Sequence, residues 1–163
     1  MATVKPHDFA SDRLRDPLSS EERAAVERHV PVKDESRVPI LSDLDIVTAR
    51  QRGRALAQRL GFSDSSLTMI ATAISELARN ILRYAKTGEM TLGVLDDHGR
   101  DGIVLVASDK GPGISDVPRA LEVGYSTSGS LGLGLPGVKR LMDDFEIVSK
   151  VGRGTTVTAT KWR

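Results

Sequence analysis

Three groups of residues in this sequence have the types and spacing to form one nucleotide pocket. Glu76 and Asn80 are four residues apart, so on a helix they lie about 40° apart on one face. Asp109 follows an apolar run and precedes Gly111 and Gly113. A second glycine-rich loop opens a helical pattern further along, and its residues are Gly132, Leu133, Gly134, Leu135 and Gly137. Each group alone is weak evidence, but the ordered set predicts a shared site.

Glu76 and Asn80 carry groups suited to metal binding and proton transfer. The amide oxygen of Asn80 suits Mg²⁺, a hard cation that takes oxygen ligands and keeps water and phosphate in its shell. The carboxylate of Glu76 could accept a proton from an attacking hydroxyl. A solvated polar helix face is the alternative interpretation of the same spacing.

Asp109, at the end of an apolar run, is placed where its carboxylate could recognise a nucleotide base. A carboxylate there can accept a hydrogen bond from an exocyclic amine, which adenine offers and the corresponding position of guanine does not. Gly111 and Gly113 can adopt positive φ, so the backbone could approach a ligand closely. An ordinary turn led by an aspartate is the alternative.

The loop at residues 132–137 opens a helix that carries Val138, Leu141 and Met142. Free backbone amides and the positive end of the helix dipole favour phosphate at such a helix start. The glycines also match the G-x-G-x-x-G pattern, but residues 125–130 are not expected to form the strand that a dinucleotide fold requires. A P-loop is excluded because the Gly-Lys-Ser/Thr ending is absent. A helix start without a ligand remains the alternative.

Hydrophobic periodicity predicts the elements that position these groups. Ser42 with Asp45, and then Ser63, are typical of helix starts. The two helices carry apolar stripes at positions 46, 49, 53, 56 and 60, and at 70, 73, 74, 77, 81 and 84. Strands are expected at residues 38–41, 90–95, 103–107, 145–150 and 155–162, with a helix at about 135–142.

Length and composition restrict the class of protein. The chain has 163 residues, enough for one domain, and its net charge of +1 gives no basic footprint for nucleic acid or membrane. It has no cysteine, and no apolar run reaches the roughly 18 residues of a spanning helix. We therefore expect a cytoplasmic protein of bacterial type, without a nucleic-acid or membrane partner. Residues 1–37 are expected to form an extension that is either flexible or a single docked helix, and residues 38–163 the domain.

The ordered motifs resemble those of the GHKL, or Bergerat-fold, ATP-binding superfamily. Glu76 and Asn80 match its N box, and Asp109 begins its first glycine box. The second and third glycine boxes correspond to Gly132, Gly134 and Gly137, and to Gly152, Gly154 and Thr155. Within the superfamily, residues 45–51, 72–81, 125–129 and 134–143 are similar to the single-domain anti-sigma-factor serine/threonine kinases, and above all to switch kinases of the RsbT type. The resemblance covers about residues 38–163.

This resemblance implies an α+β fold: a two-layer sandwich whose mixed, mostly antiparallel sheet is covered on one face by helices. It implies ATP and Mg²⁺ as cofactors, with Asn80 holding Mg²⁺ and Glu76 acting as the catalytic base or positioning it. Asp109 would read the adenine amine, and Thr155 would support it through a hydrogen bond or water. The other nucleotide contacts would come from Gly111, Gly113, Thr127 in a lid at residues 115–131, and the loop residues Gly132, Leu133, Gly134, Leu135 and Gly137.

The resemblance also implies partners. The substrate would be a serine or threonine of a STAS-domain antagonist in the stressosome, a sensory complex, and release would let the kinase activate a PP2C-type phosphatase. Two alternatives stay open. One is an anti-sigma kinase that sequesters a sigma factor directly, and the other is a nucleotide-gated binding module without catalysis.

Overall fold

The computed structural model describes residues 32–123 and 133–163. The first half of this part contains strand β1, two long helices and a short π-helical turn, followed by a hairpin. The second half contains two shorter helices and a closing hairpin. In chain order the elements are β1 (Lys33–Ile40), α2 (Asp43–Arg59), α3 (Asp64–Asn80), η1 (Ile81–Ala85), β2 (Gly88–Asp97), β3 (Arg100–Asp109), α4 (Val117–Ala120), α5 (Gly134–Leu141), β4 (Asp144–Lys150) and β5 (Gly154–Trp162).

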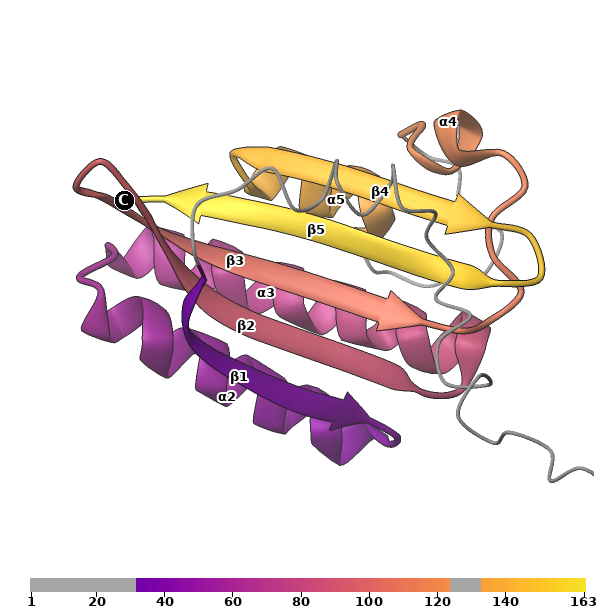
Figure 1. Ribbon diagram of the computed structural model, residues 1–163, viewed down its shortest axis with the longest axis horizontal. Coiled ribbons are helices and arrows are strands. Elements are labelled where there is room, and N and C mark those ends of the chain that lie inside the picture. Colours follow the sequence, from indigo (N-terminus) through magenta and orange to yellow (C-terminus); the bar gives the residue numbers. More distant parts are fainter. Residues whose placement is uncertain (1–31, 124–132) are drawn as a thin grey trace, which may run out of the picture.

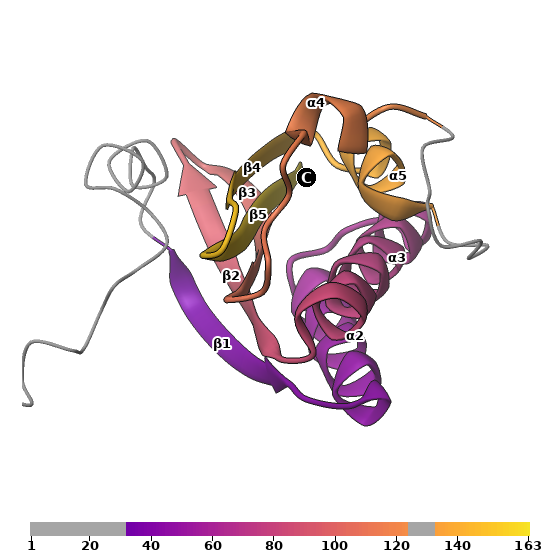
Figure 2. The same ribbon diagram turned by 90° about the vertical axis from the view of Figure 1, so that its right-hand side faces the viewer.

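The strands form one sheet in the order β1-β2-β3-β5-β4, and every neighbouring pair is antiparallel. Helices α2, α3 and α5 cover one face of this sheet (Figures 1 and 2). The two-layer fold is therefore confirmed. The sheet was expected to be mixed, and for the strands that the structure describes this is wrong, because every neighbouring pair is antiparallel.

Strand register decides which side chains meet the helices. Met90 on β2 lies opposite Ala107 on β3, which lies opposite Val157 on β5. Side chains alternate between the two faces of a strand, so these three and the residues two positions away share one face. That face and the helices enclose the largest fully buried side chains, which include Ile40, Ile70, Ile74, Leu77, Ile81, Met90, Leu92, Ile103, Leu105 and Val138.

The predicted helices and strands are present with shifted ends. The carboxylate of Asp45 accepts a hydrogen bond from the backbone N–H of Ser42 at 2.9 Å, as a helix start of this kind requires. Strand β1 begins at Lys33, five residues before the predicted start at position 38, and pairs with β2 from there on. The predicted strand is too short because residues 33–37 are charged or polar and largely exposed, so they show no apolar signal. The division of the chain at residues 37 and 38 remains a prediction, although the sheet crosses it.

Tyr84 was predicted on the apolar stripe of the second helix, and this is wrong. The helix changes to a π-helical turn, η1, after Asn80. The wider turn rotates the following residues away from the core, so Ile81 stays buried while Tyr84 is 52% exposed. A π-helical turn within a helix often marks a functional position.

No described helix is both long enough and apolar enough to cross a lipid bilayer.

Candidate functional site

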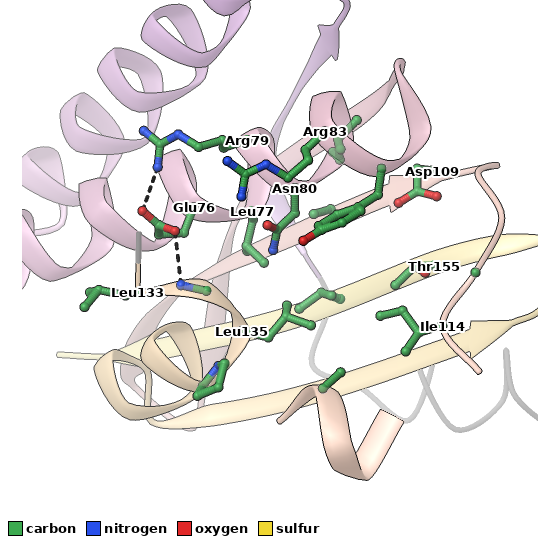
Figure 3. A pocket seen from close by; sticks show the side chains of 18 of the residues that line it. Glu76, Leu77, Arg79, Asn80, Arg83, Asp109, Ile114, Leu133, Leu135 and Thr155 are labelled. Carbon is green, nitrogen blue, oxygen red and sulfur yellow. Dashed lines mark hydrogen bonds and ion pairs between the residues drawn. The ribbon is translucent and has the colours of Figure 1, made fainter. Parts of the chain in front are cut away.

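A cavity of about 410 Å³ lies between helix α3 with η1, the ends of β3 and β5, and the start of α5. Figure 3 shows Glu76 and Asp109 at opposite ends of it, with Asn80, Leu77 and Leu135 between them. Eight of the residues predicted as a site line the cavity: Glu76, Asn80, Asp109, Gly113, Leu133, Gly134, Leu135 and Thr155. The fold thus brings together three motifs that are distant in the sequence.

At one end of the cavity Glu76 is held by two donors. Its side chain is only 10% exposed and accepts a hydrogen bond from Arg79 Nη1 at 2.7 Å. Its second oxygen accepts one from the backbone N–H of Gly134, at 3.2 Å across the cavity (Figure 3). The carboxylate therefore caps the first turn of α5, where orphan amides are free to bind an anion.

Asn80 lies one helical turn beyond Glu76 on the same face, and its half-buried side chain lines the cavity. Its amide makes no hydrogen bond to any residue in the described part of the chain, so its oxygen is available to a ligand. Among those residues no three His, Cys, Asp or Glu side chains gather as a metal cluster. The donor set fits Mg²⁺ only in the form that this ion commonly takes, with one or two protein oxygens completed by phosphate and water.

At the other end Asp109 is held by the backbone. Its Oδ1 accepts a hydrogen bond from the N–H of Gly111 at 2.8 Å. Burial raises the pKa of the Asp109 carboxyl above its ordinary value, and hydrogen bonds from the backbone amides of Gly111 and Thr155 offset part of that rise. The result is a fixed acceptor inside an otherwise apolar end of the cavity.

Ser149 on β4 organises this end and was not identified from the sequence. Its hydroxyl lies 2.8 Å from the hydroxyl of Thr155 and accepts a hydrogen bond from the N–H of Ile114, also at 2.8 Å. Thr155 therefore meets Asp109 through its backbone, while its hydroxyl is paired with Ser149. The only sequence signal was the closing hairpin, whose register places Ser149 opposite Thr155.

Gly113 allows the loop after β3 to cross the closing hairpin. Its φ is +74°, and a Cβ atom there would collide with the backbone carbonyl oxygen of Lys150. The N–H of Gly152 donates to the carbonyl of Pro112 at 2.8 Å, which fixes the crossing. A side chain at position 113 would therefore displace the loop that forms this wall of the cavity.

Two predicted nucleotide contacts do not line the cavity. Gly111 packs against Ala85, so that an added Cβ would lie 2.6 Å from the Cβ of that alanine, and it contributes its N–H to Asp109. Gly137 is buried in the first turn of α5 against Leu133. Both glycines allow close packing next to the cavity without forming part of its wall. Thr127 and Gly132 lie outside the described residues.

Three charged residues that line the cavity had no role in the predicted site. They are Arg79 on α3, Arg83 in η1 and Arg140 on α5. Charged residues on predicted helices are usually solvated, so no local signal distinguishes them. These arginines place positive charge on the walls of the cavity formed by α3, η1 and α5.

Comparisons with known proteins identify the family of this chain. Residues 41–161 match the family described as the histidine kinase-like ATPase domain. The chain is 50% identical over 131 residues to the serine/threonine-protein kinase RsbT of Bacillus subtilis, an alignment that covers 80% of this chain and 98% of that protein. It is 31% identical over 122 residues to an anti-sigma F factor of Caldanaerobacter subterraneus, covering 70% and 82%.

A solved structure shares the fold. The crystal structure of RsbU and RsbW domains of a Mycobacterium tuberculosis protein superposes with a TM-score of 0.54 at 19% identity, covering 80% of this chain. This chain spans about a third of the length of that protein, since the match covers 33% of it. The comparison supports the two-layer fold.

Proposed function

The chain belongs to the histidine kinase-like ATPase family and is a serine/threonine protein kinase, and we propose that it transfers the γ-phosphate of ATP to a STAS-domain antagonist protein. The observation that carries the proposal is a single cavity with a buried carboxylate and an amide at one end and a backbone-held acid at the other. The apolar end accepts adenine, whose exocyclic amine donates to Asp109. The triphosphate extends toward the start of α5.

The chemistry needs a proton acceptor and neutralised phosphate charge. The hydroxyl oxygen of the substrate attacks the γ-phosphorus, the bond to the β-phosphate oxygen breaks, and the hydroxyl proton passes to the carboxylate of Glu76. ADP leaves as the anion. Mg²⁺, when bound through Asn80, supplies charge neutralisation at the phosphates. The amides at the start of α5, with Leu133, Gly134 and Leu135 beside them, orient the phosphates.

The proposal extends to partner exchange. The kinase would bind its antagonist in a stressosome scaffold in the cytoplasm and, once the antagonist is phosphorylated, bind and activate a PP2C-type phosphatase. Similarity to the serine/threonine-protein kinase RsbT and to an anti-sigma F factor supports this partner-switching role.

Phosphate transfer tests the enzymatic proposal. The purified chain is incubated with γ-labelled ATP, Mg²⁺ and a panel of STAS-domain proteins encoded in the same genome. One of them is expected to become labelled on serine or threonine, and Asn80→Ala is expected to slow labelling most when Mg²⁺ is limiting. An Asn80→Ala protein that labels the substrate as fast as the unmodified chain at limiting Mg²⁺ contradicts the metal assignment. Absence of labelling across the panel, combined with ATP-dependent capture of a partner, would identify a binding module without catalysis.

A second candidate function has support from one comparison. The relative from Caldanaerobacter subterraneus is named an anti-sigma factor, so direct sequestration of a sigma subunit is the alternative output. Affinity purification of the tagged chain with and without ATP separates the two. Recovery of a sigma factor favours sequestration, and recovery of a PP2C-type phosphatase favours the switch.

A further inference from the structure

Arg79 contacts Glu76 and has no role in the reaction proposed above. It lies three residues after Glu76 on α3, and its Nη1 donates to the Glu76 carboxylate at 2.7 Å. The two side chains differ in environment, because that of Glu76 is 10% exposed and that of Arg79 is 44% exposed. The arginine therefore reaches inward from the rim to a nearly buried acid, whereas a surface ion pair would have both groups in solvent.

Nucleotide binding should affect the two hydrogen-bond donors of Glu76, Arg79 and Gly134, differently. Gly134 N–H belongs to the first turn of α5, where the triphosphate is proposed to lie. A phosphate oxygen that takes this amide removes it from Glu76, since one N–H makes one strong hydrogen bond. The contact with Arg79 comes from the same helix as Glu76 and does not depend on the position of α5.

We propose that Arg79 is a positioning residue for the proton acceptor of the kinase reaction. While nucleotide is absent, Arg79 and Gly134 together hold Glu76 across the cavity. When phosphate occupies the start of α5, Arg79 alone retains the carboxylate on the cavity side of α3, within reach of the substrate hydroxyl. This inference rests on the proposed function and adds a residue that acts through Glu76.

The geometry distinguishes this role from phosphate binding by Arg79. A guanidinium already engaged by a carboxylate at 2.7 Å has its charge partly neutralised. Arg140 on α5 also lines the cavity and has no ion pair with any described residue. Arg140 is therefore the better candidate for a direct contact with phosphate and provides a matched comparison, because its replacement removes the same charge from the same cavity.

The kinetic test uses the full-length chain, ATP, Mg²⁺ and the STAS-domain protein labelled in the transfer assay. For Arg79→Gln, kcat is expected to fall about 10- to 100-fold, as for a misplaced catalytic group, with KM for ATP changed less than about threefold. Arg79→Lys, which keeps a cation near Glu76, should recover a large part of the rate. For Arg140→Gln the change should appear mainly in KM for ATP.

The double variant Glu76→Gln/Arg79→Gln is the decisive measurement. If Arg79 acts through Glu76, the double variant is no slower than Glu76→Gln, because residues that act as a unit are not additive. A double variant slower by the full Arg79 effect would overturn the proposal and assign Arg79 to phosphate or substrate. An Arg79→Gln protein with unchanged kcat would also overturn it.

These outcomes are separable from failure of the proposed function. If the unmodified chain labels no substrate, or if Glu76→Gln is as fast as the unmodified chain, the proposed reaction or its base is wrong. Circular dichroism and the melting temperature of each variant identify loss of folding. Should Arg79→Gln not fold, Arg79→Lys together with Glu76→Gln/Arg79→Lys provides the same comparison.

Discussion

The two ends of the cavity are built differently. At the Asp109 end, contacts join elements of the sheet through the backbone and short hydroxyl groups: Gly111 N–H to Asp109, Ile114 N–H to Ser149, and Gly152 N–H to the carbonyl of Pro112. At the Glu76 end, a hydrogen bond across the cavity joins a side chain of α3 to the first amide of α5. The first end is fixed before ligand arrives, and the second has a contact that a phosphate can replace.

This difference separates recognition from reaction. Preorganised groups bind without a cost of rearrangement, so changes at the Asp109 end should appear in ATP affinity. The hydrogen bond between Gly134 and Glu76 is proposed to give way to a phosphate when ATP binds. Changes at the Glu76 end should therefore appear in the rate of phosphate transfer. Four changes test this comparison, from the largest expected effect to the smallest.

Glu76→Gln removes the proton acceptor while keeping the shape of the side chain. We expect kcat for transfer to fall about 10³-fold, which is about 4 kcal/mol of transition-state free energy. Affinity for ATP should be unchanged or higher, because the amide of Gly134 is released from a charged competitor. Calorimetric titration with ATP and Mg²⁺ provides that control, and a large loss of affinity would place Glu76 in nucleotide binding.

Gly113→Ala changes the fixed end. The added Cβ collides with the carbonyl oxygen of Lys150 at a φ of +74°, and we expect the free energy of unfolding to fall by about 3 kcal/mol with loss of ATP binding. Gly152→Ala is the matched control, because its φ is +77° and no atom lies within 4 Å of its added Cβ. It should cost about 1 kcal/mol. Equal costs in denaturant unfolding would show that backbone strain, rather than collision, governs this loop.

Asp109→Asn replaces the buried acceptor by a neutral amide. Loss of a charged hydrogen-bond acceptor should weaken ATP binding by about 2 kcal/mol, or roughly 30-fold. Thermal stability at neutral pH should not fall, because burial of the charged carboxylate opposes folding.

The pH dependence of the melting temperature, compared between the unmodified protein and Asp109→Asn, tests whether burial of the charged carboxylate lowers stability. The folded protein holds the pKa of Asp109 above its ordinary value. Its contribution to stability is therefore complete below the unfolded pKa and is lost as pH rises through the folded one. The melting temperature of the unmodified protein relative to Asp109→Asn should fall as pH rises through that window. If the melting temperature of the unmodified protein instead rises relative to that of Asp109→Asn over the same pH range, ionised Asp109 stabilises the fold.

Ser149→Ala removes the hydroxyl that joins Ile114 and Thr155. We expect ATP affinity to fall about fivefold, corresponding to about 1 kcal/mol for hydrogen bonds of this kind. Ser108→Ala is the control, since Ser108 and Thr156 form a similar hydroxyl pair, at 3.2 Å, one residue along and thus on the opposite face of the sheet. Its effect should be confined to stability. Equal losses of ATP affinity in the two variants would contradict a local role for Ser149.

Much of the fold followed from local patterns in the sequence. Apolar stripes and helix-start residues predicted α2 and α3, although the predicted second helix continued through the residues that form η1. Turn residues with β-branched runs predicted the two hairpins. Strand β1 was predicted too short because its exposed half has no apolar signal. The family resemblance is confirmed by the match over residues 41–161. The roles assigned to individual site residues remain predictions.

The sequence by itself determined which faces of α3 and which turns carry reactive groups, because spacing on a helix and glycine at positive φ are local properties. Only the tertiary structure decided how those groups are paired. Gly134 meets Glu76 from 58 residues away, Ser149 joins the loop after β3 to Thr155, and η1 turns Tyr84 out of the core. Such pairings depend on strand register and on how helices pack against the sheet, and no short stretch of sequence encodes either.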